Sequence, residues 1–191
     1  MIRDYILKNR SYRRFDGAHT ISADTLREFV DLARLSGSGA NRQPLKYILS
    51  CTPDSNAKIY ATLAWAGYLR DWDGPVEGER PTGYIILLGD KKISQSFGID
   101  PGIAAQSILL GAVERGLGGC MIASVKREAL IEALGLGEEY EILLVIALGK
   151  PVEQVFLEPL PNDGDIKYWR DPSGGHHVPK RALDEIILAE I

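Results

Sequence analysis

The sequence has few cysteines and no long apolar run. Cys51 and Cys120 are its only two cysteines, and they lie far apart without CxxC spacing. Two isolated thiols fit a reducing compartment rather than a disulfide framework. The longest apolar run, residues 142–148, has seven residues and is too short to cross a bilayer. The first residues lack the apolar core of a signal peptide, so we expect a cytoplasmic protein that does not enter a membrane.

Several enzyme signatures are also missing. There is no GxGxxG after a strand, no GxxxxGK[ST], no HExxH and no GxSxG, which disfavours Rossmann enzymes, P-loop NTPases, zincins and α/β-hydrolases. The net charge of −4 predicts no general attraction to nucleic acid. His176 and His177 are adjacent, but neighbouring side chains diverge and no third ligand accompanies them. We expect them to be polar loop residues, and we expect no metal site.

The composition is that of an ordinary globular domain. The 191 residues are 45% hydrophobic and 25% charged, which suits one domain over residues 1–191. Apolar periodicity predicts helices over 2–9, between Ser22 and Gly37, and over 53–64, 101–116 and 125–135, the last two capped by Asp100 and Ser124. Apolar runs predict strands over 46–51, 84–89 and 140–149. Helices outnumber strands without regular alternation, so we expect an α+β fold with a central mixed or antiparallel sheet covered by helices.

Two connecting segments are longer and more polar than a turn requires. Residues 36–44 read SGSGANRQP, whereas two or three residues would join a helix to a strand. Glycine permits close backbone approach, and Ser, Asn and Gln offer neutral hydrogen-bonding groups. Residues 69–83 are rich in Pro, Gly and acids, and we expect an exposed, mobile lid there.

The chain from 151 to 179 is rich in Pro, Gly and Asp and has few apolar residues. A stretch of this length without packing signals is either disordered or lies over another surface. Phe156, Tyr168 and Trp169 favour the second alternative. We therefore expect an extended arm at a subunit interface, followed by a closing helix or strand over 180–191.

Positive charge gathers at both ends of the chain. The segment NRSYRRF, residues 9–15, has three arginines and a serine. Guanidinium groups and a hydroxyl can hold a phosphate, but the same residues also suit a solvated basic helix end. The segment HVPKR, residues 177–181, supplies a second basic pair that can close on the same anion. Cys120 lies beside apolar neighbours, and we expect a buried side chain rather than a reactive thiol.

Five segments together carry a resemblance to a known family. NRSYRRF, LSGSGANRQP, GERPTGYIILLGD, DPGIAAQSILLGAVERGLGGCMIAS and HHVPKRALDEII resemble, in order and spacing, the nitroreductase family of FMN-dependent oxidoreductases. The match runs along essentially the whole chain. It implies a homodimer with two FMN sites at the subunit interface. One departure is Asn9, because the family often has a second arginine directly before Arg10.

The resemblance also implies which residues bind FMN. Those that hold FMN and its phosphate are Arg10, Ser11, Arg13, Lys180 and Arg181. Those that lie on the flavin from the facing subunit are Ser38, Gly39, Asn41 and Gln43. Those that approach N5 through backbone groups are Ala123 and Ser124. The flavin N5 carries the chemistry, so no catalytic side chain is required, and Arg13 acts as an electrostatic stabiliser of the reduced flavin.

Three functions are compatible with this pattern. The leading one is an FMN oxidoreductase that uses NADH or NADPH to reduce a nitroaromatic, quinone or related small-molecule acceptor by a ping-pong mechanism. A specialised reaction of the family, such as reductive dehalogenation or flavin fragmentation, is the second. The third is a non-catalytic flavin-binding or electron-carrying protein without a nicotinamide site.

Overall fold

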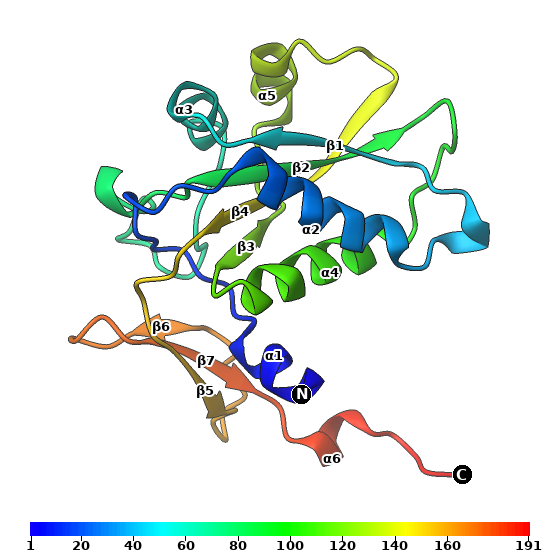
Figure 1. Cartoon of the computed structure of the whole chain (residues 1–191). Coiled ribbons are helices and arrows are strands. Elements are labelled where there is room, and N and C mark those ends of the chain that lie inside the picture. Colours follow the sequence, from blue (N-terminus) through cyan, green and yellow to red (C-terminus); the bar gives the residue numbers. More distant parts are fainter.

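Four antiparallel strands form the main sheet of the computed structural model, which describes residues 1–191 (Figure 1). In spatial order they are β1 (Leu45–Ser50), β2 (Gly83–Asp90), β4 (Tyr140–Gly149) and β3 (Gly118–Ile122). Every residue of β2 is buried, and so is most of β4. Strands covered on both faces read as continuous apolar runs, which is why these two strands were visible in the sequence.

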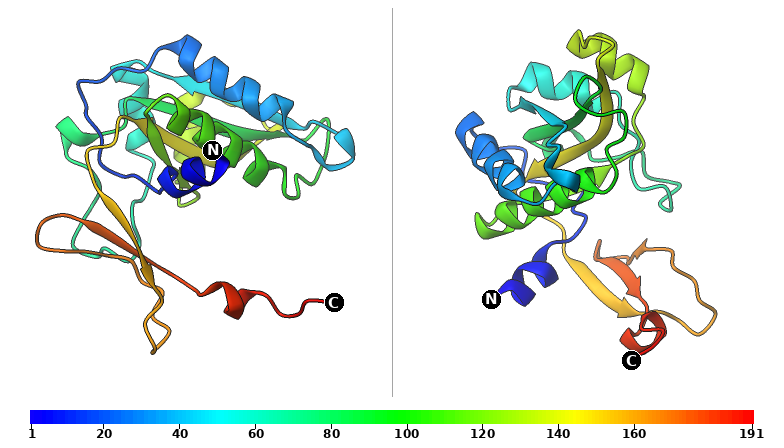
Figure 2. Two further views of the ribbon diagram at one scale, coloured as in Figure 1. Left: turned by 60° about the horizontal axis from the view of Figure 1, so that its bottom comes forward. Right: turned by 90° about the vertical axis from the view of Figure 1, so that its right-hand side faces the viewer.

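Helices cover both faces of the main sheet (Figure 2). One face carries α2 (Ala23–Leu35) and α4 (Asp100–Glu114), and the other carries α3 (Pro53–Tyr60) and α5 (Arg127–Leu134). Successive side chains of β2 point to opposite faces. Ile85 therefore packs with the cluster under α2 and α4, whereas Ile86 packs with the cluster under α3 and α5. The expected α+β class with a helix-covered sheet is confirmed, and the sheet is antiparallel.

A second, smaller sheet lies apart from the main one (Figures 1 and 2). Its order is β5 (Val155–Pro159), β7 (His176–Lys180) and β6 (Trp169–Arg170). β5 and β7 are parallel, and β6 and β7 are antiparallel. For residues 151–179 we considered only disorder or a position over another surface, and we did not expect this segment to form a sheet of its own. His176 and His177 lie in β7 rather than in a loop, and short polar strands that pair over a distance leave no local pattern.

The remaining helices are short and lie near the ends of the chain or in its loops. They are α1 (Ile2–Lys8), α6 (Leu183–Ile186) and the 3₁₀ turns η1 (Gly39–Asn41) and η2 (Glu77–Glu79). Only four residues of the predicted closing element are helical. None of the helices combines the length and the apolar character that crossing a membrane requires.

Two predicted helix caps are corrected by the structure. Ser124 does not cap α5, because Lys126 occupies the N-cap position and Ser124 instead accepts a backbone hydrogen bond from Ala64. Asp100 is the first residue of α4 rather than its cap. Its carboxylate instead binds Ser38 and Gly39 in the loop between α2 and β1. Both positions have a residue type that favours capping, but tertiary contacts decide where the helix begins.

Gly119 lets β3 lie close to its neighbours in the main sheet. A Cβ atom there would be 2.5 Å from the carbonyl oxygen of Ala147 and 2.8 Å from the side chain of Leu109. Because the backbone of β4 cannot yield, we expect Gly119→Ala to lower the free energy of unfolding by about 1–3 kcal/mol. Gly102, on α4, has open space around it. Gly102→Ala is the control and should leave stability unchanged or slightly raised. Chemical denaturation that finds the two variants equally stable would contradict the close packing.

Candidate functional site

The basic segment at residues 10–15 is fixed to both sheets. Ser11 forms an isolated bridge with Gly119 of β3, and the backbone N–H of Tyr12 donates to the Gly119 carbonyl at 3.0 Å. Phe15 is fully buried and pairs with Pro151, which lies between β4 and β5. These contacts place the segment where the two sheets meet.

Glu153 is the buried acceptor that orders this segment. Its side chain has no exposed surface. It accepts hydrogen bonds from the backbone N–H of Arg13 and, at 3.1 Å, from that of Arg14, and Arg170 Nη2 donates to its other oxygen at 3.0 Å. A carboxylate with several donors is well compensated for its loss of water. Glu153 thereby ties the arginine segment to β6.

The neighbouring arginine is engaged on the opposite side. Arg14 donates from Nε and Nη2 to the two carboxylate oxygens of Glu79, both at 2.6 Å. This bidentate pair directs Arg14 toward η2, and Arg14 does not line the cavity described next. Of the three arginines in the segment, only Arg10 and Arg13 therefore remain for an anion.

A cavity of about 260 Å³ opens between this segment and the second sheet. Its lining residues are Asn9, Arg10, Ser11, Arg13, Val155, Tyr168, His176, Val178 and Lys180. Arg10 donates from Nη2 to the Ile6 carbonyl at 2.6 Å, but its Nε is buried and has no partner. The cavity thus contains three cationic side chains and a serine, with no carboxylate in its lining. This is the chemistry of an anion site.

Arg13 and His176 form the floor of this cavity. Arg13 Nη1 lies 3.2 Å from His176 Nε2, and its guanidinium lies 4.8 Å above the Tyr168 ring. His176 is 1% exposed. Burial, with the charges of Arg13 and Arg170, lowers the His176 pKa from 6.5 to about 4. The neutral ring therefore accepts from Arg13 at Nε2, which assigns the proton to Nδ1, an atom that is buried without a partner.

A second cavity, of about 170 Å³, lies at the loop between α2 and β1. Ser38 Oγ donates to one oxygen of Asp100 at 2.6 Å, and the Gly39 N–H donates to the other at 2.9 Å. The Gln43 N–H donates to Ser38 Oγ at 2.9 Å. Asp100 is 6% exposed, so this bond network is largely shielded from water.

The same loop holds a strained backbone. Ala40, Asn41 and Gln43 have φ values of 50°, 54° and 51°. Non-glycine residues rarely adopt this left-handed region, and three in one loop persist only where other contacts hold them. The hydrogen bonds to Asp100 and Ser38 provide that support. Such strain gathers at ligand sites, and the binding role of the loop stays a prediction.

The structure sorts the predicted site residues into separate places. The first cavity is lined by Arg10, Ser11, Arg13 and Lys180, and the loop cavity is lined by Ser38 and Gln43. Gly39 and Asn41 belong to the same loop as Ser38. Three predicted site residues are exposed and line neither cavity: Ala123, Ser124 and Arg181.

Sequence reasoning missed four residues of these sites: Asp100, Glu153, Tyr168 and His176. The Asp100-Pro101 pair was noticed in the sequence, but Asp100 was interpreted as a helix cap rather than as a residue of the site. No sequence pattern points to Glu153, because its partners Arg13 and Arg14 lie far away in the chain. The expected burial of Cys120 is confirmed, and burial raises the pKa of its thiol. No cluster of three or more His, Cys, Asp or Glu side chains is arranged for a metal ion.

Comparison with known proteins gives one family. Residues 79–150 match the model of the nitroreductase family, and no curated protein matches the chain. An FMN complex from Desulfovibrio desulfuricans, described as a nitroreductase, has 20% identity and a TM-score of 0.72, with 100% of this chain and 96% of that chain covered. An FMN-dependent nitroreductase from Clostridium difficile R20291 has 21% identity and a TM-score of 0.65, covering 81% and 89%. A nitroreductase family protein from Clostridium novyi NT has 23% identity and a TM-score of 0.66, covering 79% and 86%. The resemblance drawn from the sequence motifs is confirmed.

The buried histidine predicts a pH dependence of stability. In the native protein the His176 pKa is about 4, whereas an unfolded histidine titrates near 6.5. Between these values the unfolded chain binds a proton that the native protein does not, so stability falls as the pH falls. From pH 7 to pH 5 we expect this histidine to lower the free energy of unfolding by about 2 kcal/mol. In His176→Gln that part of the loss should disappear when denaturation is measured at both pH values.

The neighbouring histidine acts in the opposite direction but does not disturb the comparison. Hydrogen bonds to Asp171 and Glu158 raise the pKa of His177, so its contribution grows at low pH. It is present in both proteins and cancels in the difference. His19→Gln, at an exposed histidine, is the control. If His176→Gln and the wild type lose equal stability on acidification, the buried neutral state of His176 is refuted.

Proposed function

We propose that this chain, which matches the nitroreductase family model over residues 79–150, is a member of that family and an FMN-dependent oxidoreductase that uses NADH or NADPH to reduce small-molecule acceptors by a ping-pong mechanism. Nitroaromatics, quinones and related compounds are the proposed acceptor class. The single observation that carries the proposal is the cavity at Arg10, Arg13 and Lys180, which has three cations and no carboxylate in its lining. The family and the fold supply the flavin context.

The residues present fit the FMN phosphate. Arg10 Nε is a buried donor without an acceptor. Burial also lowers the Arg10 pKa, and a guanidinium that has lost water favours a site where an oxyanion replaces it. Ser11 adds a hydroxyl at the cavity wall. Asn9 donates to Gln106 at 3.3 Å, so it ties the segment to α4 at the position where the family often has an arginine.

A homodimer is part of the proposal. Within one chain the cationic cavity and the strained loop are lined by different residues, and we propose that the loop of a second copy completes the site. α1 has no buried residue, although Ile2, Ile6 and Leu7 are apolar and exposed. A helix of seven residues is not stable on its own. We propose that a partner subunit buries this face.

The proposed roles of the chain's residues are binding and electrostatics. When bound, FMN supplies hydride and electron transfer at its N5 edge. Arg13 is the electrostatic stabiliser, since His176 and Tyr168 hold its guanidinium at the cavity floor. Ser38, Gly39, Asn41 and Gln43 are the proposed flavin wall of the facing subunit. Ala123 and Ser124 are proposed to approach N5, and Arg181 to assist at the phosphate.

Reduction by a nicotinamide tests the function directly. We expect NADH or NADPH, mixed with the FMN-loaded protein in a stopped-flow instrument, to bleach the flavin, and an added quinone to restore its colour. A ping-pong enzyme carries out the two half-reactions separately. Bleaching by dithionite alone would refute the proposal and favour the non-catalytic electron carrier. A specialised reaction, such as dehalogenation or flavin fragmentation, would instead give nicotinamide bleaching without reoxidation by nitroaromatics or quinones.

The phosphate assignment makes a separate prediction. Arg10→Ala should weaken FMN binding by about 1.5–3 kcal/mol, because it removes a charge-assisted contact. Riboflavin has no phosphate, so its affinity should change much less. Arg3→Ala, an exposed arginine on α1 outside the cavity, is the matched control. Fluorescence titration that finds equal losses for FMN and riboflavin would remove Arg10 from the phosphate site.

A further inference from the structure

His177 lies on the face of the second sheet that is turned away from the cationic cavity. Its strand, β7, is the middle strand of this sheet. The cavity is lined by His176, Val178 and Lys180 of β7, and successive side chains of a strand point to opposite faces. His177 therefore points to the other face, and it does not line the cavity.

Both ring nitrogens of His177 contact a carboxylate. Nδ1 lies 2.7 Å from Glu158 Oε1, on β5, and Nε2 lies 2.9 Å from Asp171 Oδ2, directly after β6. An ionised carboxylate only accepts hydrogen bonds, so each ring nitrogen donates. Only the imidazolium has a hydrogen on both nitrogens. The geometry therefore assigns a positive charge to His177, and its hydrogen bonds to Asp171 and Glu158 raise its pKa.

Two aromatic rings enclose this imidazolium. In the strand register Phe156 of β5 and Trp169 of β6 both lie opposite His177. The centroid of each ring is 5.0 Å from that of His177, and the ring planes are 25° and 7° from parallel with the imidazole. A cation next to an aromatic face is attracted by it. The stacked rings therefore favour the charged form of His177.

The charged and titratable groups around His177 come from all three strands. β5 contributes Glu158, the turn after β6 contributes Asp171, and β7 itself contributes His176. His176 points to the opposite face and is neutral, because burial lowers its pKa to about 4. Neither carboxylate has another ion-pair partner. The imidazolium is thus the one cation that compensates both of them.

The two carboxylates are supported unequally. Asp171 also accepts from the backbone N–H groups of Ser173 at 2.8 Å and Gly175 at 2.9 Å, within its own turn. Glu158 has no other hydrogen-bond donor, and its side chain is 35% exposed. When His177 loses a proton, one ring nitrogen turns a lone pair toward a carboxylate, and that contact breaks. Glu158 is released, because its side chain can turn to water whereas Asp171 is held in place.

We propose that His177 is a proton-operated clasp on the cationic cavity: as an imidazolium it joins β5 to the turn after β6, and loss of its proton loosens β5 against β7. Both strands line the cavity, β5 through Val155 and β7 through Lys180. The three strands have only five, two and five residues, so cross-strand side-chain contacts matter for their pairing. The affinity of the cavity for the FMN phosphate therefore falls when His177 loses its proton, a consequence that rests on the proposed function.

Long-range proton–nitrogen NMR spectra of the wild-type chain report the charge of His177 directly. We expect its ring to titrate above pH 6.5, where an unperturbed histidine titrates. The stabilisation by the clasp is then present below that pH and is lost as the pH rises through the native pKa. A ring that titrates at or below pH 6.5 would overturn the clasp. This measurement needs neither FMN nor a variant.

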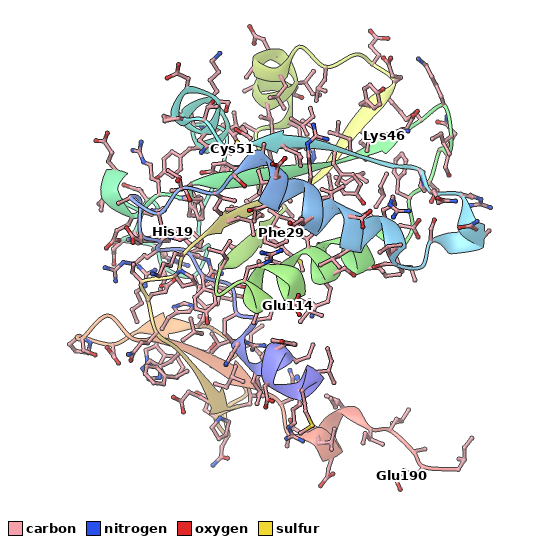
Figure 3. All side chains as sticks on the ribbon, in the orientation of Figure 1. His19, Phe29, Lys46, Cys51, Glu114 and Glu190 are labelled. Carbon is pink, nitrogen blue, oxygen red and sulfur yellow. The ribbon has the colours of Figure 1, made fainter.

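Variants of the carboxylates test the two contacts. Glu158→Gln and Asp171→Asn each remove a negative charge and keep a hydrogen-bond acceptor. Each should lower the pH at which His177 titrates. Glu190→Gln is the matched control, since Figure 3 labels the exposed Glu190 at the end of the chain, away from the second sheet. A His177 titration that is the same in all three variants and the wild type would refute the double contact.

Hydrogen exchange tests the loosening of β5 without FMN. At one pH below the His177 titration, the amides of β5 should exchange about threefold or more faster in His177→Gln than in the wild type, because the clasp is absent. The amides of β2, in the main sheet, are the internal reference and should exchange equally in both proteins. Equal protection of β5 in the two proteins would contradict the proposal.

FMN affinity tests the coupling to the cavity. From pH 7 to pH 9 the phosphate stays a dianion. The wild type should bind FMN about threefold or more weakly above the His177 titration than below it, with the midpoint seen by NMR. His177→Gln should lack this step, and the same step in both proteins would overturn the coupling. Failure of FMN to bind at all would refute the proposed function, whereas NMR and hydrogen exchange would still decide the clasp.

Discussion

The buried carboxylate of Glu153 is the contact on which the cationic cavity depends. It lies just after the main sheet ends, and it binds the backbone of Arg13 and Arg14 together with the Arg170 side chain. Without it, two backbone N–H groups and a guanidinium would lose their acceptor at the junction of the two sheets. Because removal of one partner of a buried ion pair is strongly destabilising, the fold constrains this position tightly. Glu153 thereby fixes the backbone at Arg13 next to β6, whose Arg170 pairs with His176 of β7.

Glu153 compensates the backbone and Arg170, but it leaves the cavity itself positive. Arg13 turns to a neutral histidine and to the face of Tyr168, neither of which carries a negative charge. Burial of His176, and after it the charge of Arg13, lowers the pKa of this histidine. The positive charge of Arg13 therefore stays in a largely buried position at the cavity. Such an arrangement is ready for an anion before one arrives, because its donors are already positioned.

The strongest elements of the fold were predictable because their signals are local. β2 and β4 are buried on both faces and appear as apolar runs, and α2 and α4 show helical spacing. The second sheet was not predictable, since His176 of β7 pairs with Val155 of β5 across a stretch of polar chain. The candidate site divides in the same way. Arginine clusters and the glycine-serine loop are visible in the sequence, whereas their buried supports depend on tertiary contacts.

Asp100 plays the same structural role at the loop cavity as Glu153 plays at the cationic cavity. Each is a buried carboxylate that accepts from the backbone of a loop distant in sequence, Gly39 in one case and Arg13 in the other. Each holds a segment that local preferences alone would leave unformed: three left-handed residues near Asp100, and clustered arginines near Glu153. The chain therefore builds both cavities from its own contacts. Because the two are supported independently, the homodimer we propose does not require either cavity to refold.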